Sequence, residues 1–310
     1  MITTIISAHN EEKNIRNILK DVIRELNNLN EKSELIISLS GCNDRTEEFA
    51  KDEIKNSKLD IKIFKTPKGK IKSQRKTLNK INRTSEFIIF IDCDIRLKKN
   101  ALKNMIKDAK KYPDVKLFYS TEIPIKRNNI LYKIINVRTI NPEYVIAKEE
   151  VSDFHPYSDN KRKKVFATGG MYLVRKGIYD VDGKAIGDDS YLTHSIYHRF
   201  GFGTIKQTED AIIYYQPVYT FSSWIKKWRR IWSDIENLYL NHPEFKYLEE
   251  YMVLRIDFRK LAKEKRIKLM LCFLLERIWN KFGGFVFKKF LLKKGKNWSQ
   301  LYETKEVDIL

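Results

Sequence analysis

The stretch FIIFIDCD at residues 87–94 runs from five apolar residues directly into two carboxylates, Asp92 and Asp94. A continuous apolar run of this length is typical of a strand that is buried on both faces of a parallel sheet. Because side chains alternate along a strand, the two carboxylates should point to the same side. Two like charges at such a position require a cation, and a divalent metal that carries phosphate oxygens would supply it.

The place of these carboxylates in the predicted sheet suggests which ligand they bind. Ligands of open α/β sheets bind in the crevice outside the carboxyl ends of the strands. The stretch therefore indicates a site for a metal-bound nucleoside diphosphate. A surface turn is the simpler alternative, because Asp-x-Asp occurs often by chance. The rest of the chain has to decide between the two interpretations.

The composition favours an anionic partner. The chain has 310 residues, is 42% hydrophobic and carries a formal net charge of +20, which fits nucleic acid, acidic lipid or a phosphorylated substrate. Cys42, Cys93 and Cys272 lie far apart, so they indicate neither a disulfide framework nor a zinc site, and we expect a cytoplasmic protein. The sequence shows no evident signal peptide and no apolar run of about 20 residues that would cross a bilayer.

The first part of the chain alternates between strand and helix patterns. Asn10, which follows the first strand, is either the N-cap of the first helix or part of a ligand loop at the strand's end. The short connections between alternating elements predict a parallel sheet with right-handed crossovers. Strands are expected at 3–8, 34–39, 59–64 and 86–91, and helices at 15–29, 46–54 and 71–81.

The α/β pattern continues after a long interruption. The irregular segment 122–164 is where we expect the acceptor to bind, because long loops in a domain are often binding segments. Helices are expected at 97–111, 186–200 and 221–240, and strands at 115–121, 165–174 and 205–215, the second of these interrupted by a glycine pair.

Three motifs in this part have both a structural and a functional interpretation. Gly169 and Gly170 indicate either a tight turn or a close backbone approach to a ligand. Adjacent acids at the start of a helix, Asp188 and Asp189, are either partners of the helix dipole or site residues. The helix at 221–240 carries three tryptophans at helical spacing, which usually form core, but it also carries the pair RR at 229–230, which suits diphosphate oxygens.

The segment 255–297 is strongly basic, with fourteen Lys or Arg residues against Asp257, Glu264 and Glu276. Its apolar runs at 269–275 and 282–287 are flanked by bases and tryptophans, as in helices that lie in a membrane interface. The alternatives are a helical pair that packs on the catalytic domain and a nucleic-acid-binding segment. No recognised nucleic-acid-binding module is present, so we expect no nucleic-acid partner.

These motifs resemble, in type and order, those of family 2 glycosyltransferases of the GT-A type over roughly residues 1–240. The GCNDRT turn resembles the family's Gly-Ser-x-Asp-x-Thr turn, and Asp92-Cys93-Asp94 resembles its Asp-x-Asp metal motif. Asp188-Asp189 with Leu192 is similar to its Glu-Asp-x-x-Leu segment, whose second acid is the base. The other matching stretches are IISAHNEE at 5–12, Gly-Lys at 69–70, Thr-Leu-Asn at 77–79 and the glycines at 169–170.

The resemblance implies an α/β fold of the GT-A type, with a Rossmann-like, mostly parallel sheet, flanking helices and a basic, aromatic helical region at the C-terminus. It also implies a catalytic domain at 1–240 and a basic amphipathic tail at 241–310. Within the catalytic domain, residues 1–121 would bind the nucleotide and residues 122–240 would bind the acceptor and carry out catalysis.

The resemblance also assigns roles to single residues. Asp94, assisted by Asp92, would hold Mn²⁺ or Mg²⁺, and Asp189, next to Asp188, would be the base of an inverting transfer. The residues that it implies for nucleotide-sugar binding are Ala8, Asn10, Glu12, Asp44, Lys70, Asp92, Gly169, Gly170, Arg229 and Arg230.

The sequence departs from the family at two places. Ser7 stands where proline is usual, and Leu39 and Ser40 stand where acids that help hold uridine are common. A UDP-sugar is nevertheless the expected donor. The expected acceptor is a hydroxyl or phosphate of a lipid-linked or polysaccharide molecule of the cell envelope. The protein would be a hexosyltransferase bound peripherally to the anionic inner face of the membrane. The alternatives are a nucleotidyltransferase and a non-catalytic lipid- or nucleic-acid-binding protein that retains the fold.

Overall fold

The computed structural model describes residues 1–146, 166–252 and 255–286, with the side chains of 146 and 282–286 left undescribed. These residues form two compact units. The sheet unit comprises Met1–Glu122 and Phe166–Tyr215, and the helical unit comprises the described residues between 123 and 146 and between 216 and 286. The predicted division into a catalytic domain at 1–240 and a tail at 241–310 is a division by function. The two units are defined by contacts within the chain, so the predicted division stays a prediction.

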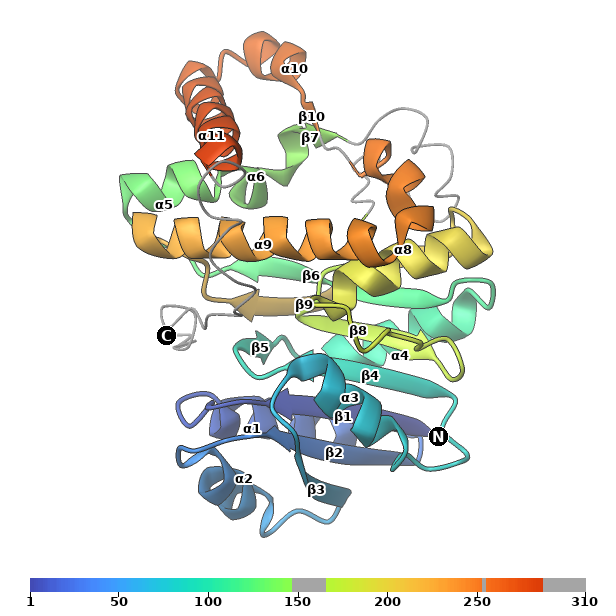
Figure 1. The fold of residues 1–310 in the computed structure, drawn as a ribbon. Helices are drawn as coiled ribbons and strands as arrows, with labels where there is room; N and C mark the ends of the chain where they lie inside the picture. Colours follow the sequence, from blue (N-terminus) through green and yellow to red (C-terminus); the bar gives the residue numbers. More distant parts are fainter. Residues whose placement is uncertain (147–165, 253–254, 287–310) are drawn as a thin grey trace. The chain divides into compact units, whose positions relative to one another are not determined.

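The sheet unit contains a single eight-stranded mixed sheet (Figure 1). β1 pairs in parallel with β2 and β4, and β2 pairs in parallel with β3, as the alternating pattern predicts. β8 lies antiparallel between β4 and β6, and β5 pairs antiparallel with β9. The strand order is β3-β2-β1-β4-β8-β6-β9-β5, with β1 (Ile2–Ala8), β2 (Ser33–Ser40), β3 (Asp60–Thr66), β4 (Phe87–Asp92), β5 (Ile95–Leu97), β6 (Leu117–Pro124), β8 (Met171–Arg175) and β9 (Ile205–Tyr215).

The predicted α/β class is therefore confirmed, and β4 is its central buried strand. Phe87, Ile88, Ile89, Phe90 and Ile91 are each at most 2% exposed, which is the two-sided burial that the apolar run predicts. Of the strand predicted at 165–174, the described residues 166–170 are not strand, and β8 begins only at Met171.

The structure does not describe residues 147–165, so residues 147–164 of the predicted acceptor segment 122–164 lie outside the described residues.

The first helix begins at Ile15, as predicted, and Asn14 lies at its N-cap position, so the capping alternative for Asn10 is excluded. The helix predicted from residue 97 begins at Ala101, since residues 95–97 form the short strand β5 instead. The helices of the sheet unit are α1 (Ile15–Asn27), α2 (Thr46–Ile54), α3 (Lys70–Leu78), α4 (Ala101–Lys111) and α8 (Asp188–Phe200).

The helical unit is built around a small apolar cluster. Val137, Tyr144, Leu261 and Phe273 are at most 3% exposed and join α6, η1, α10 and α11. None of the helices in the described part of the chain is long and apolar enough to cross a membrane. The elements of the helical unit are α5 (Ile130–Ile135), α6 (Val137–Ile140), η1 (Pro142–Tyr144), β7 (Val145–Ile146), α9 (Phe221–Asn241), η2 (Pro243–Glu250), β10 (Arg255–Ile256), α10 (Phe258–Lys263) and α11 (Ile267–Val286).

A fully buried carboxylate, Glu34, ties the amino-terminal ends of the parallel strands together. It accepts hydrogen bonds from Thr3 Oγ1 at 2.7 Å and from the backbone N–H of Asn82 at 2.7 Å, and it pairs with Lys62 Nζ at 2.6 Å. Burial alone would raise the pKa of this carboxyl, but Lys62, Asn82 and Thr3 together hold the pKa below its usual value. The carboxylate therefore stays charged inside the sheet unit.

The Glu34 network predicts a stability that depends on pH. A carboxyl whose pKa is lower in the folded state than in the unfolded state stabilises the fold above its unfolded pKa, and this contribution is lost as pH falls through the folded pKa. We expect Glu34→Gln to lower the free energy of unfolding near neutral pH by about 1.5–3 kcal/mol, the range for hydrogen bonds to charged groups. The deficit should shrink as pH falls below about 4.5.

Urea denaturation of wild type and variant, near neutral pH and at progressively more acidic pH, measures this difference. Glu47→Gln is the control, because the Glu47 carboxylate pairs with Lys51 and Lys65 at the surface, where ion pairs contribute little. A deficit for Glu34→Gln that is independent of pH, or no larger than that of Glu47→Gln, would contradict the account.

Candidate active site

Four charged residues meet at the carboxyl end of β4. Asp92 is the last residue of this strand, Asp94 follows in the turn, Lys70 begins α3 and Asp188 begins α8. The ammonium of Lys70 lies 2.8 Å from Asp92 Oδ1 and 3.1 Å from Asp188 Oδ1. The predicted residues Lys70, Asp92 and Asp188 are thus brought together from three separate elements.

The carboxylate of Asp188 is fixed on all sides. Its Oδ2 accepts hydrogen bonds from Tyr172 Oη at 2.7 Å and from Gln74 Nε2 at 2.9 Å, and the residue is 3% exposed. Burial alone would raise the pKa of Asp188, but Lys70 and these two hydrogen bonds hold the pKa below its usual range. Asp188 is therefore a permanent anion that positions Lys70.

Asp92 lies in the opposite electrostatic situation. Burial raises the pKa of its carboxyl, and repulsion from Asp94 and Asp188 adds to the effect, so that the pKa reaches about 7 despite the attraction of Lys70. Burial alone would lower the pKa of Lys70, but Asp188, Asp92 and Asp189 together hold it well above the usual value. The cluster thus carries more negative charge than one ammonium group compensates.

A divalent cation fits this donor set. Asp92 and Asp94 supply hard oxygen ligands, which Mg²⁺ and Mn²⁺ prefer. Within the residues that the structure describes, no group of three or more His, Cys, Asp and Glu side chains forms a complete metal cage. An ion bound here would take its other ligands from water and substrate oxygens, as Mg²⁺ commonly does with phosphates.

The glycine pair lies where packing is close at this edge. A Cβ on Gly170 would lie 2.6 Å from Ile213 Cδ1 and 3.0 Å from Glu122 Oε1, and the Gly170 carbonyl accepts a hydrogen bond from the N–H of Asp92 at 2.9 Å. A Cβ on Gly169 would lie 3.0 Å from Asp189 Oδ2. The absent side chain of Gly169 therefore makes room for the carboxylate of Asp189, which is only half-buried.

The loops after β1 and β2 join each other beside this cluster. Asn10 has a left-handed backbone with φ 54°, and its Oδ1 accepts a hydrogen bond from the N–H of Asn43 at 3.0 Å. Asp44 Oδ2 accepts from the N–H of Glu12 at 3.2 Å, and Glu12 Oε2 accepts from the N–H of Arg45 at 3.1 Å. The predicted donor-binding residues Asn10, Glu12 and Asp44 thus form one framework, and their contact with a nucleotide stays a prediction.

Two further groups of predicted residues are placed differently. Ala8 is fully buried at the end of β1, so it contributes backbone rather than side chain. Arg229 and Arg230 are half-buried on α9 and belong to the helical unit. Their predicted contact with the diphosphate stays a prediction, because the carboxylate cluster belongs to the sheet unit.

Comparison with known proteins identifies the family from which this arrangement comes. The model of the family described as glycosyl transferase family 2 matches residues 3–181, more than half of the chain. The chain belongs to this family. The matched residues include the Asp92–Asp94 motif and end before Asp188. A search among curated proteins gives no match.

Solved GT-A glycosyltransferases share the fold of this family 2 chain. A mannosyltransferase from Pyrobaculum calidifontis in complex with GDP-mannose and Mn²⁺ matches with a TM-score of 0.56 at 14% identity, over 78% of this chain and 64% of its own. A glucosyl-3-phosphoglycerate synthase from Mycobacterium tuberculosis in complex with Mn²⁺, UDP and phosphoglyceric acid matches with a TM-score of 0.51 at 16% identity, over 77% of each chain. At such identities the likeness shows the fold alone.

The site of this family 2 member also contains residues that sequence reasoning missed. Gln74 and Tyr172 hold Asp188, and Tyr179 Oη donates to Gln74 Oε1 at 2.7 Å. One signal was available for Gln74, which lies four residues after Lys70 and therefore on the same face of a helix. Tyr172 lies in the strand pattern after the glycine pair. Its hydrogen-bond partner Asp188 belongs to α8, so no local pattern links the two residues.

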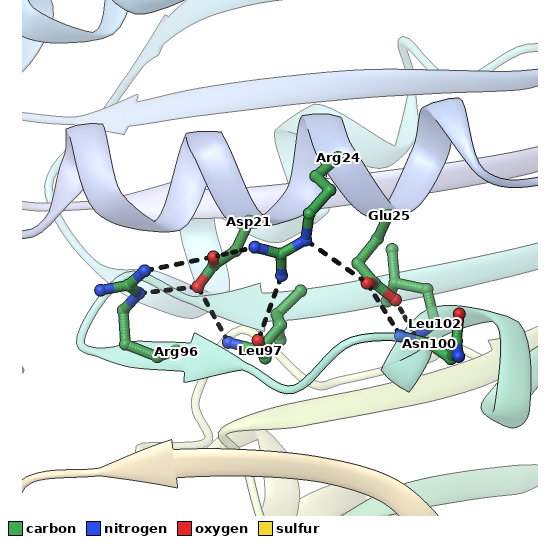
Figure 2. Close-up of polar contacts among 7 residues, drawn as sticks. All are labelled: Asp21, Arg24, Glu25, Arg96, Leu97, Asn100 and Leu102. Atoms are coloured by element: carbon green, nitrogen blue, oxygen red, sulfur yellow. Dashed lines mark hydrogen bonds and ion pairs between the residues drawn. The ribbon is translucent and has the colours of Figure 1, made fainter. Parts of the chain in front are cut away.

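A second set of missed residues holds the strand that follows the Asp92–Asp94 turn (Figure 2). Asp21 on α1 is 2% exposed and accepts hydrogen bonds from Arg96 Nε at 2.7 Å, from the N–H of Leu97 at 3.0 Å and from Arg24 Nη1 at 3.0 Å. Residues 96 and 97 belong to β5, which begins directly after Asp94. Asp21 therefore anchors the strand that fixes the far side of the turn.

Glu25, the next acid on the same face of α1, binds a different part of the chain. Glu25, also 2% exposed, accepts hydrogen bonds from the N–H groups of Asn100 at 2.9 Å and Leu102 at 3.2 Å. These are donors at the start of α4, which has no side-chain cap of its own. Glu25 therefore supports a helix start farther along the chain, whereas Asp21 supports the strand that follows the Asp92–Asp94 turn.

This contrast predicts separate effects of two matched substitutions. Asp21→Asn keeps the side-chain size but removes the charge that pairs with Arg96, so the turn that carries Asp94 should loosen. Outer groups that orient metal ligands typically affect metal affinity by about 10–100-fold, and we expect a loss of roughly tenfold in Mn²⁺ affinity. Glu25→Gln should lower the unfolding midpoint while Mn²⁺ affinity stays at the wild-type level.

Calorimetric titration of Mn²⁺ in the presence of a nucleoside diphosphate measures affinity, and thermal unfolding measures stability. If the two variants lose stability equally and neither changes Mn²⁺ affinity, Asp21 has only a structural role. If both lose affinity in parallel, the effect is a general one of α1.

Proposed function

We propose that the chain is a metal-dependent glycosyltransferase that moves a sugar from a nucleoside diphosphate to an acceptor hydroxyl or phosphate. One observation carries the proposal. Two adjacent acids at the start of α8 have separate environments, with Asp188 buried and paired to Lys70, and Asp189 half-buried against Gly169. Such a pair supplies a fixed anion and a usable base beside the metal-binding carboxylates.

The donor end of the proposed site combines Asp92, Asp94 and Lys70. Asp94 and Asp92 would hold Mn²⁺ or Mg²⁺, and the bound metal would neutralise the charge that builds on the leaving diphosphate. Lys70 has three N–H donors, and Asp92 and Asp188 are within reach of two of them. The third would donate to a diphosphate oxygen. Membership of family 2 and the two neighbours solved with Mn²⁺ and nucleotides support this assignment.

The acceptor end of the proposed site depends on Asp189. Its carboxylate would take the proton from the acceptor hydroxyl as the oxygen attacks the anomeric carbon of the sugar. The bond between that carbon and the diphosphate oxygen breaks on the opposite side, so the configuration inverts. A side chain at Gly169 would displace the carboxylate of Asp189, because its Cβ would lie 3.0 Å from Asp189 Oδ2.

The finer assignments of donor and acceptor are also part of the proposal. The donor would be a UDP-sugar or a GDP-sugar, since the two neighbours were solved with one or the other nucleotide. The acceptor would be a lipid-linked or polysaccharide molecule reached from the inner membrane face. This fits the net charge of +20. Arg229 and Arg230 would add to diphosphate binding.

Release of nucleoside diphosphate tests the proposal directly. Purified protein is incubated with MnCl₂ and each of several UDP- and GDP-sugars, with and without simple phosphate and sugar acceptors. Asp189→Asn should lower the turnover rate by about 10²–10⁴-fold, the usual contribution of a general base. The Kd for the donor should be unchanged, because Asp189 is not expected to bind the nucleotide.

Asp180→Asn is the matched control, because it neutralises an exposed acid in the loop that precedes α8. Turnover by this control should equal that of wild type. If Asp189→Asn turns over as fast as wild type with a donor that wild type uses, then Asp189 is not the base. If no nucleotide sugar binds or reacts, the transferase assignment fails.

A further inference from the structure

Helix α11 has apolar side chains on two faces. Its inner face contributes Phe273, which is fully buried against Val137 and Leu261. Its outer face is not covered within the described chain. The exposed apolar residues on that face are Ile267 at 64%, Leu271 at 52%, Leu274 at 39%, Leu275 at 43% and Ile278 at 60%. Their spacing of three or four residues makes one continuous stripe, which we call the α11 stripe.

The α11 stripe leads into an apolar pocket between α5, α9 and α11. The ring centroids of Trp224 and Trp279 are 5.3 Å apart, and the ring of Phe221 meets that of Trp279 edge to face with a centroid distance of 4.6 Å. The pocket holds about 110 Å³, on the scale of cavities that take small apolar molecules. It is lined by Leu131, Ile134, Ile135, Trp224, Leu275, Glu276 and Trp279.

The pocket is continuous with the α11 stripe, and the one acid in its lining is paired with an arginine. Leu275 belongs to both the pocket and the stripe. The single acid in the lining, Glu276, is 5% exposed and its Oε1 pairs with Arg138 Nε at 2.9 Å. Further exposed apolar side chains lie on the two neighbouring helices, namely Ile130 at 70% on α5, and Phe221 at 44% and Ile225 at 38% on α9.

Positive charge borders this apolar surface. Between residues 255 and 281 the exposed acid is Glu264, whereas eight bases are exposed. They are Arg255, Arg259, Lys263, Lys265, Arg266, Lys268, Arg277 and Lys281. A surface that combines an aliphatic stripe, tryptophans and bases complements an anionic lipid surface, which offers both hydrocarbon and negative charge.

Two other occupants fit the surface less well. A second copy of the chain would bring the same eight bases toward each other, which costs electrostatic energy. A nucleic acid would satisfy the bases, but it offers no partner for exposed aliphatic side chains such as Ile267, Leu271 and Ile278. Large exposed apolar patches generally mark a binding surface rather than ordinary solvated surface.

We propose that the helical unit docks on anionic lipid through the α11 stripe and that the pocket lined by Trp279 takes the end of one hydrocarbon chain of a lipid. The inference deepens the proposed function, and it rests on that function only for the claim that this lipid is the acceptor. Docking itself requires no nucleotide and no metal.

Vesicle co-sedimentation of the full chain without nucleotide tests the docking surface. Wild type should bind vesicles of phosphatidylcholine with phosphatidylserine and bind phosphatidylcholine alone more weakly. Leu271→Glu with Ile278→Glu should weaken binding to the anionic vesicles by at least about tenfold, since each places a charge where hydrocarbon should lie. Leu240→Glu is the matched control, because Leu240 is 71% exposed and lies roughly 20 Å along α9 from Ile225.

Tryptophan quenching tests the pocket. Phosphatidylcholine with brominated acyl chains, added to phosphatidylserine vesicles, should quench the protein's emission, and Trp279→Phe should remove more of the quenched emission than Trp228→Phe. Absence of quenching in wild type would overturn the pocket assignment. Equal vesicle binding by the stripe variant and wild type would overturn the docking surface. A dimer in light scattering that the same two substitutions dissociate would assign the stripe to a second copy instead.

The outcomes separate this inference from the proposed function. The stripe variant should bind the nucleotide sugar and release diphosphate from it in solution as wild type does, because none of its changed residues belongs to the carboxylate cluster. Vesicle binding without any nucleotide-sugar turnover would leave the docking surface intact and overturn the transferase assignment. Turnover of a nucleotide sugar without vesicle binding would leave the transferase assignment intact and overturn the docking surface.

Discussion

The ammonium of Lys70 lies between the carboxylates of Asp92 and Asp188, and the geometry of the site depends on this pair of contacts. β4 and α8 each deliver an acid to the same edge of the sheet, where burial and mutual repulsion would otherwise force them apart. A single lysine at the start of α3 compensates only part of that charge. The remaining negative potential, centred on Asp92 and Asp94, is what makes the edge attractive to a divalent cation.

Neighbouring acids at the start of α8 show how position decides chemistry. Asp188 points into a polar pocket made by Tyr172 and Gln74, where every oxygen is engaged and the charge is permanent. Asp189, one residue later, lies over the backbone of Gly169 and remains half-buried. Asp188 therefore holds the lysine, while the role of Asp189 as the base stays part of the proposal. Gly169 leaves room for the carboxylate of Asp189, because a Cβ there would lie 3.0 Å from Asp189 Oδ2.

The sequence predicts some of this well, and the reasons are local. The parallel half of the sheet follows from periodicity, and the two-sided burial of β4 follows from its unbroken apolar run. The antiparallel insertion of β8 beside β4 has no local signal, because pairing depends on residues distant in the chain. β5 is three residues long, too short for a periodic pattern, and Asn10 adopts a left-handed backbone rather than the capping position.

The contacts of Asp21 and Glu25 also cannot be predicted from local sequence patterns. Asp21 and Glu25 are four residues apart beside the apolar stripe of α1, which places them on one face, but their partners in β5 and α4 are more than seventy residues away. Lys70 was expected to serve the donor directly, and the structure adds its ion pairs with Asp92 and Asp188. The predicted roles of Arg229 and Arg230 depend on α9, which belongs to the other compact unit.

Metal-dependent nucleotide binding tests the central claim most directly. Thermal unfolding of wild type with UDP or GDP, with and without MnCl₂, is compared with that of Asp94→Asn. A ligand at a hundred times its dissociation constant stabilises the fold by roughly 2.7 kcal/mol, and the account predicts a shift of this order only when Mn²⁺, nucleotide and the Asp94 carboxylate are all present. An equal shift without Mn²⁺, or an equal shift in Asp94→Asn, would contradict it.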